Sequence, residues 1–400
     1  MMFIKGGNVN LIVIHPFGRA GSVLFQSLLD GHSNIFTFPH FGPIFSKMRE
    51  DITLNGTNQF DDEVLKFIRN HPEIFDTSKG YFGKEVFAVS GSFGDKFDEH
   101  IRTDITIFRK NTISLKNQLF AGKTKITKKE FFELICFSFF SARGGDINQV
   151  RYIAYHPHKL DEMDELLNYY PNLFFVGMFR DPISCWNSWK KVISKRSRIK
   201  EKKISKPWAF YYALNHIQNV YRLSEFEHKL QNKIYIDLIR LHNLNSKAME
   251  LVSDWLDIPF NEKLLSSTFC DKRWSGNSAA GKISVGLDEN KKDQVDGLKI
   301  SEAKEYSSLV NGSYSYLNYY GDHKTQIASS TLSIFELLKY FFVERISYMW
   351  HTMSIGGFFF NLPSHISKSI FSIKARQNVN EELLLVNRQL ACRERSGEFL

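Results

Sequence analysis

Cysteine is scarce in this sequence, with four among 400 residues. The four, Cys136, Cys185, Cys270 and Cys392, are scattered along the chain and form no C-x-x-C pair. Closely spaced pairs are typical of zinc sites, and regular sets of cysteines are typical of small disulfide-bonded secreted proteins. The spacing here indicates neither, so a reducing compartment is the simpler expectation.

Long apolar runs are also lacking. No stretch reaches the roughly 18 uncharged apolar residues of a membrane-spanning helix. The nearest, residues 346–362, contains His351 and two glycines. We expect a core helix there, with a segment lying against a membrane or a partner as the alternative. The N-terminal residues show neither the cationic start nor the cleavage site of a secretory signal, so we expect a cytoplasmic protein.

The overall composition, 43% hydrophobic and 24% charged, is that of an ordinary soluble globular protein. The formal net charge of +9 indicates an anionic partner, whether a nucleotide, a sulfated sugar, nucleic acid or a membrane surface. The basic run at 190–206 is interpreted first as a solvated face, and alternatively as a rim for an anionic acceptor. No nucleic-acid-binding motif accompanies it, so we expect no nucleic-acid partner.

Short apolar runs at 10–14, 151–156, 172–179 and 233–239 predict buried strands, and helical patterns follow three of them. This alternation predicts an α/β fold with a parallel sheet flanked by helices. Residues 41–150 are interpreted as a mainly helical insertion. A break near 321–330 divides a main domain, 1–325, from a helical C-terminal extension, 326–400.

Residues 15–23, HPFGRAGSV, connect the first predicted strand to a helix that we expect to start at Ser22. Backbone N–H groups at a helix start lack partners within the helix and can bind an anion. Gly18 and Gly21 permit a tight turn, Arg19 adds a positive charge, and Ser22 adds a hydroxyl donor. A plain strand-to-helix turn is the alternative. The G-x-x-x-x-G-K-[ST] signature of nucleoside triphosphatases does not fit this loop.

A second motif, FRDPISCWNSW at 179–189, follows another predicted strand. Arg180 comes directly after that strand, and Pro182 is expected at the first position of a helix. Ser188 lies about two helical turns further on. A guanidinium at a strand end and a hydroxyl on the helix can both reach one dianionic phosphate. The alternative is a capping Asp181 with a structural arginine.

In this order, and each after a strand, the two motifs resemble those of sulfotransferases that use 3′-phosphoadenosine 5′-phosphosulfate (PAPS). The resemblance covers roughly 10–50 and 150–285, and it implies a P-loop-like sheet. It also implies that the first loop holds the 5′-phosphosulfate and that the second motif holds the 3′-phosphate. The late segment KRWSGNSAAGK at 272–282 resembles the loop that closes over the nucleotide in this family. The nucleotide-binding residues implied are Gly18, Arg19, Ala20, Gly21, Ser22, Val23, Arg180, Ser188, Arg273, Trp274 and Gly276.

A hydroxyl acceptor needs a general base, and histidine suits this role near neutral pH. His156 and His158, at the end of the predicted strand 151–156, resemble the His-x-His of uronosyl 2-O-sulfotransferases. That likeness implies that His158 is the base, that His156 is its neighbour, and that Arg19 assists catalysis. His15 and His40 are reserve candidates for the base. No metal is implied, and Trp274 is expected either to stack on adenine or to pack in the core.

These features predict a sulfotransferase that transfers the sulfuryl group of PAPS to a hydroxyl of a carbohydrate or glycolipid. Ala20 and Val23 stand where the family has hydroxyl residues. A non-catalytic nucleotide- or anion-binding module on a decayed sulfotransferase fold is therefore the main alternative. A nucleotide-dependent kinase is a second alternative, which the missing P-loop lysine disfavours. The C-terminal extension is a candidate for peripheral membrane contact and for a homodimer surface.

Overall fold

The structure is a computed structural model. It describes residues 9–40, 42–54, 58–78, 100–157, 160–197, 216, 219–220, 222–274 and 286–287. The predicted extension at 326–400 lies outside the described residues, as do His158 and Gly276.

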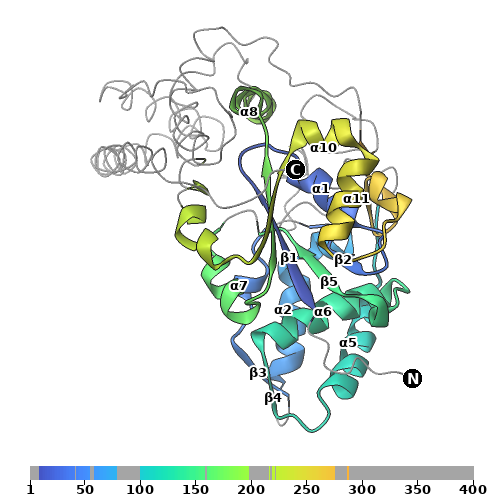
Figure 1. The fold of residues 1–400 in the computed structure, drawn as a ribbon. Helices are drawn as coiled ribbons and strands as arrows, with labels where there is room; N and C mark the ends of the chain where they lie inside the picture. Colours follow the sequence, from blue (N-terminus) through green and yellow to red (C-terminus); the bar gives the residue numbers. More distant parts are fainter. Residues whose placement is uncertain are drawn as a thin grey trace, which may run out of the picture.

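Five parallel strands form the central sheet, in the order β2-β5-β1-β6-β7 (Figure 1). The strands are β1 (Asn10–Pro16), β2 (Ile35–Thr37), β5 (Tyr152–Tyr155), β6 (Phe174–Phe179) and β7 (Asn232–Asp237). The prediction of a P-loop-like parallel sheet flanked by helices is confirmed. After β1, the strands β2 and β5 lie on one side of it, and β6 and β7 lie on the other side. The strand order therefore changes direction at β1, and the ligand-binding crevice of such a sheet is expected at the C-terminal end of β1.

The apolar runs form strands because both faces of the sheet are covered. Successive side chains of a strand point to opposite faces. Leu11 and Val13 accordingly join one hydrophobic cluster, whereas Ile12 and Ile14 join the other, and all four are fully buried.

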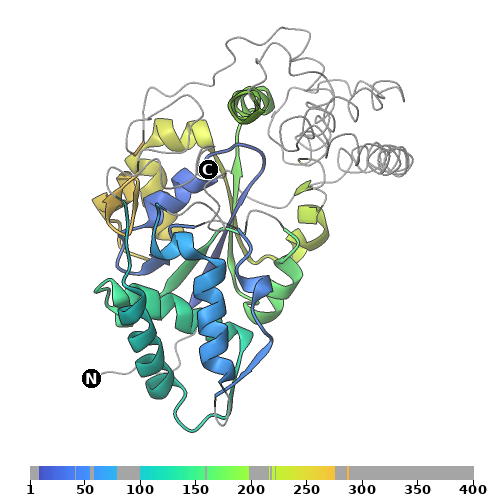
Figure 2. The same ribbon diagram turned by 180° about the vertical axis from the view of Figure 1, so that it is seen from behind.

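Helices cover both faces of this sheet. On the face of Ile12, three helices lie together in both views: α1 (Ser22–Leu29), α10 (Leu238–Leu244) and α11 (Ser246–Trp255) (Figures 1 and 2). On the face of Leu11, residues of α6 (Lys128–Ala142) and α7 (Met163–Tyr169) build the core.

The described part of 41–150 is mainly helical. Its helices are α2 (Gln59–Asn70), α3 (Pro72–Phe75), α5 (Ile105–Leu119) and α6, and an antiparallel pair joins β3 (Asp51–Thr53) to β4 (Lys125–Thr127). A capping box between Thr127 and Glu130 starts α6. Short 3-10 turns occupy Phe45–Lys47, Ile147–Gln149, Glu227–Lys229 and Glu262–Leu265.

The remaining elements lie toward the C-terminal ends of the strands or on the α1 side of the sheet. Helix α8 (Pro182–Ser197) follows β6 beyond the edge of the sheet (Figure 1), and a short hairpin joins β8 (Thr268–Phe269) to β9 (Lys272–Arg273). Within the described part of the chain, no helix combines the length and the apolar character needed to cross a membrane.

The predicted strand at 233–239 ends earlier than expected. Residues 238 and 239 belong to α10 because Asp237 caps that helix: its carboxylate accepts hydrogen bonds from the backbone N–H groups of Ile239 and Arg240, both at 2.9 Å. The apolar pattern alone continues through this boundary.

Candidate functional site

The loop between β1 and α1 forms a tight, glycine-dependent cradle. Helix α1 begins at Ser22 as predicted, with Gly21 as its N-cap. Gly18 and Gly21 have positive φ angles of 85° and 78°. A Cβ atom on Gly21 would lie 2.4 Å from a methyl carbon of Leu238, so another residue here would strain the backbone and force the Leu238 side chain to move. The backbone N–H of Phe17 donates to the Met178 carbonyl at 2.9 Å, which ties the loop to β6.

The second motif lies at the end of the neighbouring strand. Arg180 directly follows β6 and is buried, and α8 begins at Pro182 as predicted. The Asp181 carboxylate accepts a hydrogen bond from the backbone N–H of Ser184 at 2.7 Å, so Asp181 does cap α8. This cap holds the start of α8 directly beside Arg180.

The structure brings the two motifs together. Arg19 Nε donates a hydrogen bond to Ser188 Oγ at 3.1 Å, although the two residues are 169 positions apart. β1 and β6 are hydrogen-bonded neighbours, so the loop after one strand and the helix after the other meet at the same edge of the sheet. The guanidinium of one motif and the hydroxyl of the other therefore lie in one place, so a single ligand with two anionic groups could contact both motifs.

His156 follows β5, the other neighbour of β1, and is buried. Its Nδ1 lies 3.2 Å from Oε1 of Gln26 on α1. The Gln26 amide nitrogen donates to the carbonyl oxygens of Phe38 and His40, both at 3.0 Å. Two carbonyl oxygens can only accept, so this contact pair sets the orientation of the amide. His156 Nδ1 must then carry a proton, which leaves Nε2 as the basic nitrogen of the neutral ring.

Gln26 was missed in the sequence. It is polar and buried on a helix whose neighbouring residues Phe25, Leu28 and Leu29 are also buried. A glutamine on the core-facing side of an amphipathic helix is the signal that could have identified it, because a buried amide needs hydrogen-bond partners.

The β8–β9 hairpin lies beside α1. The Asp30 carboxylate, at the end of α1, accepts hydrogen bonds from Thr268 Oγ1 at 2.8 Å and from the Asp271 N–H at 3.2 Å. Trp274 is buried and packs edge-on against Phe269, in one cluster with Val23. The predicted nucleotide-covering segment therefore starts beside the first turn of α1, with Arg273 exposed next to it.

The two residues that depart from the family pattern are both buried. Ala20 is fully enclosed in the core between α1 and the sheet, and Val23 is enclosed by Ile101, Phe269 and Trp274. A hydroxyl at either position would lie in an apolar environment. The reserve His15 is also fully buried, edge-on to Phe17, at the end of β1.

No protein-family model matches this sequence, and no curated protein matches it. Solved structures similar to the chain include the sulfotransferase domain from the curacin biosynthetic pathway, at 15% identity and a TM-score of 0.41, with 76% of this chain and 98% of that domain covered. The sulfotransferase domain of the Synechococcus PCC 7002 olefin synthase is similar at 13% identity and a TM-score of 0.42, with 77% and 95% covered. Sulfotransferase STF9 from Mycobacterium avium is similar at 13% identity and a TM-score of 0.35, with 64% of this chain and 66% of that chain covered.

Proposed function

We propose that this protein is a sulfotransferase that transfers the sulfuryl group of PAPS to a hydroxyl of a carbohydrate or glycolipid. The observation that supports this most strongly is the hydrogen bond between Arg19 and Ser188. It joins the glycine-containing loop after β1 to the Arg180 motif after β6, the two parts that a nucleotide with separate 5′ and 3′ anionic groups would need.

The residues of this site fit PAPS as the sulfuryl donor. Gly18 and Gly21 hold the loop in a conformation that allows close approach of an anion to the backbone at the start of α1. In the proposal this loop, with Arg19 and Ser22, binds the 5′-phosphosulfate. Arg180 and Ser188 bind the 3′-phosphate, and the segment that begins at Arg273 closes over the nucleotide.

PAPS would supply an activated sulfuryl group, and the protein has to align and stabilise its transfer. In transfer to a hydroxyl, the bond from sulfur to the acceptor oxygen forms while the bond from sulfur to the phosphate oxygen breaks. Arg19 and the N–H groups at the start of α1 stabilise the negative charge that develops on the leaving phosphate. A general base removes the hydroxyl proton, which typically contributes about 10²- to 10⁴-fold.

The base is proposed to come from the His156–His158 pair. His156 lies at the C-terminal end of β5, next to β1. Its Nδ1 contacts the side-chain amide of Gln26 on α1, so its basic Nε2 points away from that amide. Asparagine substitutions at His156 and at His158, each assayed for single-turnover rate and for nucleotide affinity, identify the base. The base variant loses rate while it keeps nucleotide affinity.

Calorimetric titration with 3′,5′-adenosine bisphosphate, the product nucleotide, tests the site. Wild type should bind it more tightly than 5′-AMP, and Arg180→Ala should abolish this preference. Arg151→Ala is the matched control, because Arg151 is an exposed arginine at the opposite end of β5, paired with Asp257. Equal binding of 5′-AMP, or unchanged binding by Arg180→Ala, would refute the proposed nucleotide site.

Turnover separates the proposal from its alternatives. Preference for the 3′-phosphate together with sulfation of an acceptor supports the sulfotransferase. The same preference with no turnover across an acceptor screen indicates a binding module, and binding of ATP without any preference for a 3′-phosphate indicates a kinase.

A further inference from the structure

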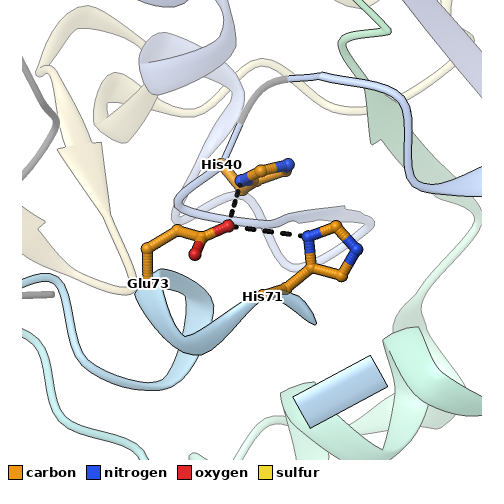
Figure 3. Close-up of side chains that lie close together, drawn as sticks. All are labelled: His40, His71 and Glu73. Carbon is orange, nitrogen blue, oxygen red and sulfur yellow. Dashed lines mark ion pairs between the residues drawn. The ribbon is translucent and has the colours of Figure 1, made fainter. Parts of the chain in front are cut away.

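Three buried side chains meet outside the site described above (Figure 3). His40 follows β2, His71 lies between α2 and α3, and Glu73 lies on α3. Their exposed fractions are 4%, 3% and 7%. In Figure 3 both imidazole rings turn an Nδ1 atom toward the same carboxylate.

The distances are those of a small coordination site. Glu73 Oε1 lies 3.1 Å from His40 Nδ1 and 3.5 Å from His71 Nδ1. One ligand atom from each of the three residues can be chosen so that all lie within 4.8 Å of one another. In tetrahedral zinc sites with bonds of about 2.0–2.1 Å, neighbouring ligand atoms are about 3.3 Å apart. The two carboxylate–imidazole distances are close to this value, and the wider separation within the group, up to 4.8 Å, would have to shorten when an ion binds.

The charge of the group also favours a cation. Across the described residues, no lysine or arginine forms an ion pair with Glu73, whose partners are the two imidazoles. A buried charge is unfavourable unless a counter-charge or a metal balances it.

We propose that His40, His71 and Glu73 bind one divalent transition-metal ion, of which zinc is the expected example. Two imidazole nitrogens with one carboxylate oxygen suit zinc and its first-row neighbours better than magnesium or calcium, which prefer oxygen ligands alone. Water completes the coordination.

The ion has a structural role. It connects the short helix α3 of the insertion to the chain that leaves β2. The backbone around His40 is already held in place, because the His40 carbonyl accepts a hydrogen bond from Gln26. Such outer contacts orient a metal ligand. Without the ion, the close imidazole–carboxylate contacts and the packing of Ile74 and Phe75 in the core would still hold α3 in place, so the ion would add to an existing attachment.

Cobalt(II) titration of the untagged full-length protein, after removal of metals by a chelator, tests the proposal. Wild type should bind one equivalent of cobalt with a visible ligand-field absorption band. Glu73→Gln, which preserves shape but removes the anionic ligand, should weaken cobalt binding at least tenfold. Zinc should raise the melting temperature of wild type but leave that of Glu73→Gln unchanged.

Glu63→Gln is the matched control, because Glu63 is a largely buried glutamate on α2 that pairs with Lys66 and lies outside the group. It should bind cobalt like wild type. Equal cobalt binding by Glu73→Gln, or no stoichiometric binding by wild type, would overturn the proposal.

X-ray absorption at the zinc edge of the wild-type protein keeps the test decisive if Glu73→Gln does not fold. Two imidazoles and an oxygen at about 2.0–2.1 Å are expected. A shell that contains sulfur or fewer than two imidazoles would overturn the assignment. Because none of the three residues belongs to the nucleotide site, this result is independent of the proposed sulfotransferase activity.

Discussion

At the scale of single residues, hydrogen bonds determine which ring nitrogen of His156 and of His32 carries a proton. Gln26 accepts from His156 Nδ1, as its two carbonyl contacts require. His32 has the opposite arrangement: the backbone N–H of Asn34 donates to its Nδ1 at 3.1 Å, and its Nε2 lies 2.9 Å from the Pro259 carbonyl oxygen. One protein therefore contains both tautomers, each set by a neighbouring group.

This difference can be measured by long-range ¹H–¹⁵N NMR correlation on the neutral rings. We expect His156 to be protonated on Nδ1 and His32 on Nε2. His32 is the internal control, since it is also buried but lies apart from the proposed base. Protonation of His156 on Nε2 would contradict the orientation of Gln26 and the proposed role of that nitrogen as a base.

At the scale of single elements, the start of α1 depends on Gly21. Its φ of 78° is unfavourable for any residue with a Cβ, and Leu238 occupies the space that a Cβ would need. The cradle is thus held by packing between the starts of two helices, α1 and α10.

Gly21→Ala should lower the free energy of unfolding by about 1–3 kcal/mol and weaken nucleotide binding. Gly122→Ala is the matched control, because Gly122 has a φ of 80° and no atom within 4 Å of an added Cβ. Urea unfolding of both variants separates the conformational cost from the clash with Leu238. Equal losses in the two variants would show that the clash is unimportant.

Helix α6 contains a glutamate that should make stability depend on pH. Burial raises the pKa of Glu133 from 4.5 to about 7, in spite of nearby Lys129 and a hydrogen bond from Tyr170. The folded protein therefore holds a proton that the unfolded chain releases near pH 4.5. This contribution to stability is complete below pH 4.5 and is lost as the pH rises through about 7.

Glu133→Gln should remove this dependence. Relative to wild type, the variant should be more stable above pH 7 by at most about 3 kcal/mol, and the difference should vanish near pH 4. Urea unfolding at several pH values measures it. A benefit that is the same at pH 4 and pH 8 would indicate a packing effect instead of ionisation.

At the scale of the whole molecule, β1 lies at the centre of the sheet between β5 and β6, and the main candidate residues follow these three strands. A ligand bound there contacts segments distant in the sequence and should stabilise the fold as a unit. With 3′,5′-adenosine bisphosphate at 100 times its dissociation constant, the free energy of unfolding should rise by about 2.7 kcal/mol. Denaturant unfolding measures this gain, and Arg180→Ala should lose it at the same nucleotide concentration.

Much of the architecture could be predicted from local patterns. The four apolar runs correspond, in chain order, to β1, β5, β6 and β7. The predicted helix starts at Ser22 and Pro182 are confirmed. Strand β2 was not predicted, because its three residues are too few to show a periodic pattern. Its hydrogen bonds with β5 define it, and β5 lies more than 100 residues further along the chain.

The sequence by itself determined which segments become buried strands and where helices begin, because short continuous apolar runs and helix capping involve residues close in the chain. Only the tertiary structure decided the strand order, and through it the pairing of Arg19 with Ser188, the contact of Gln26 with His156 and the meeting of His40, His71 and Glu73. Each of these depends on segments that are distant in sequence and that come together only when the sheet and its insertion pack around a common core.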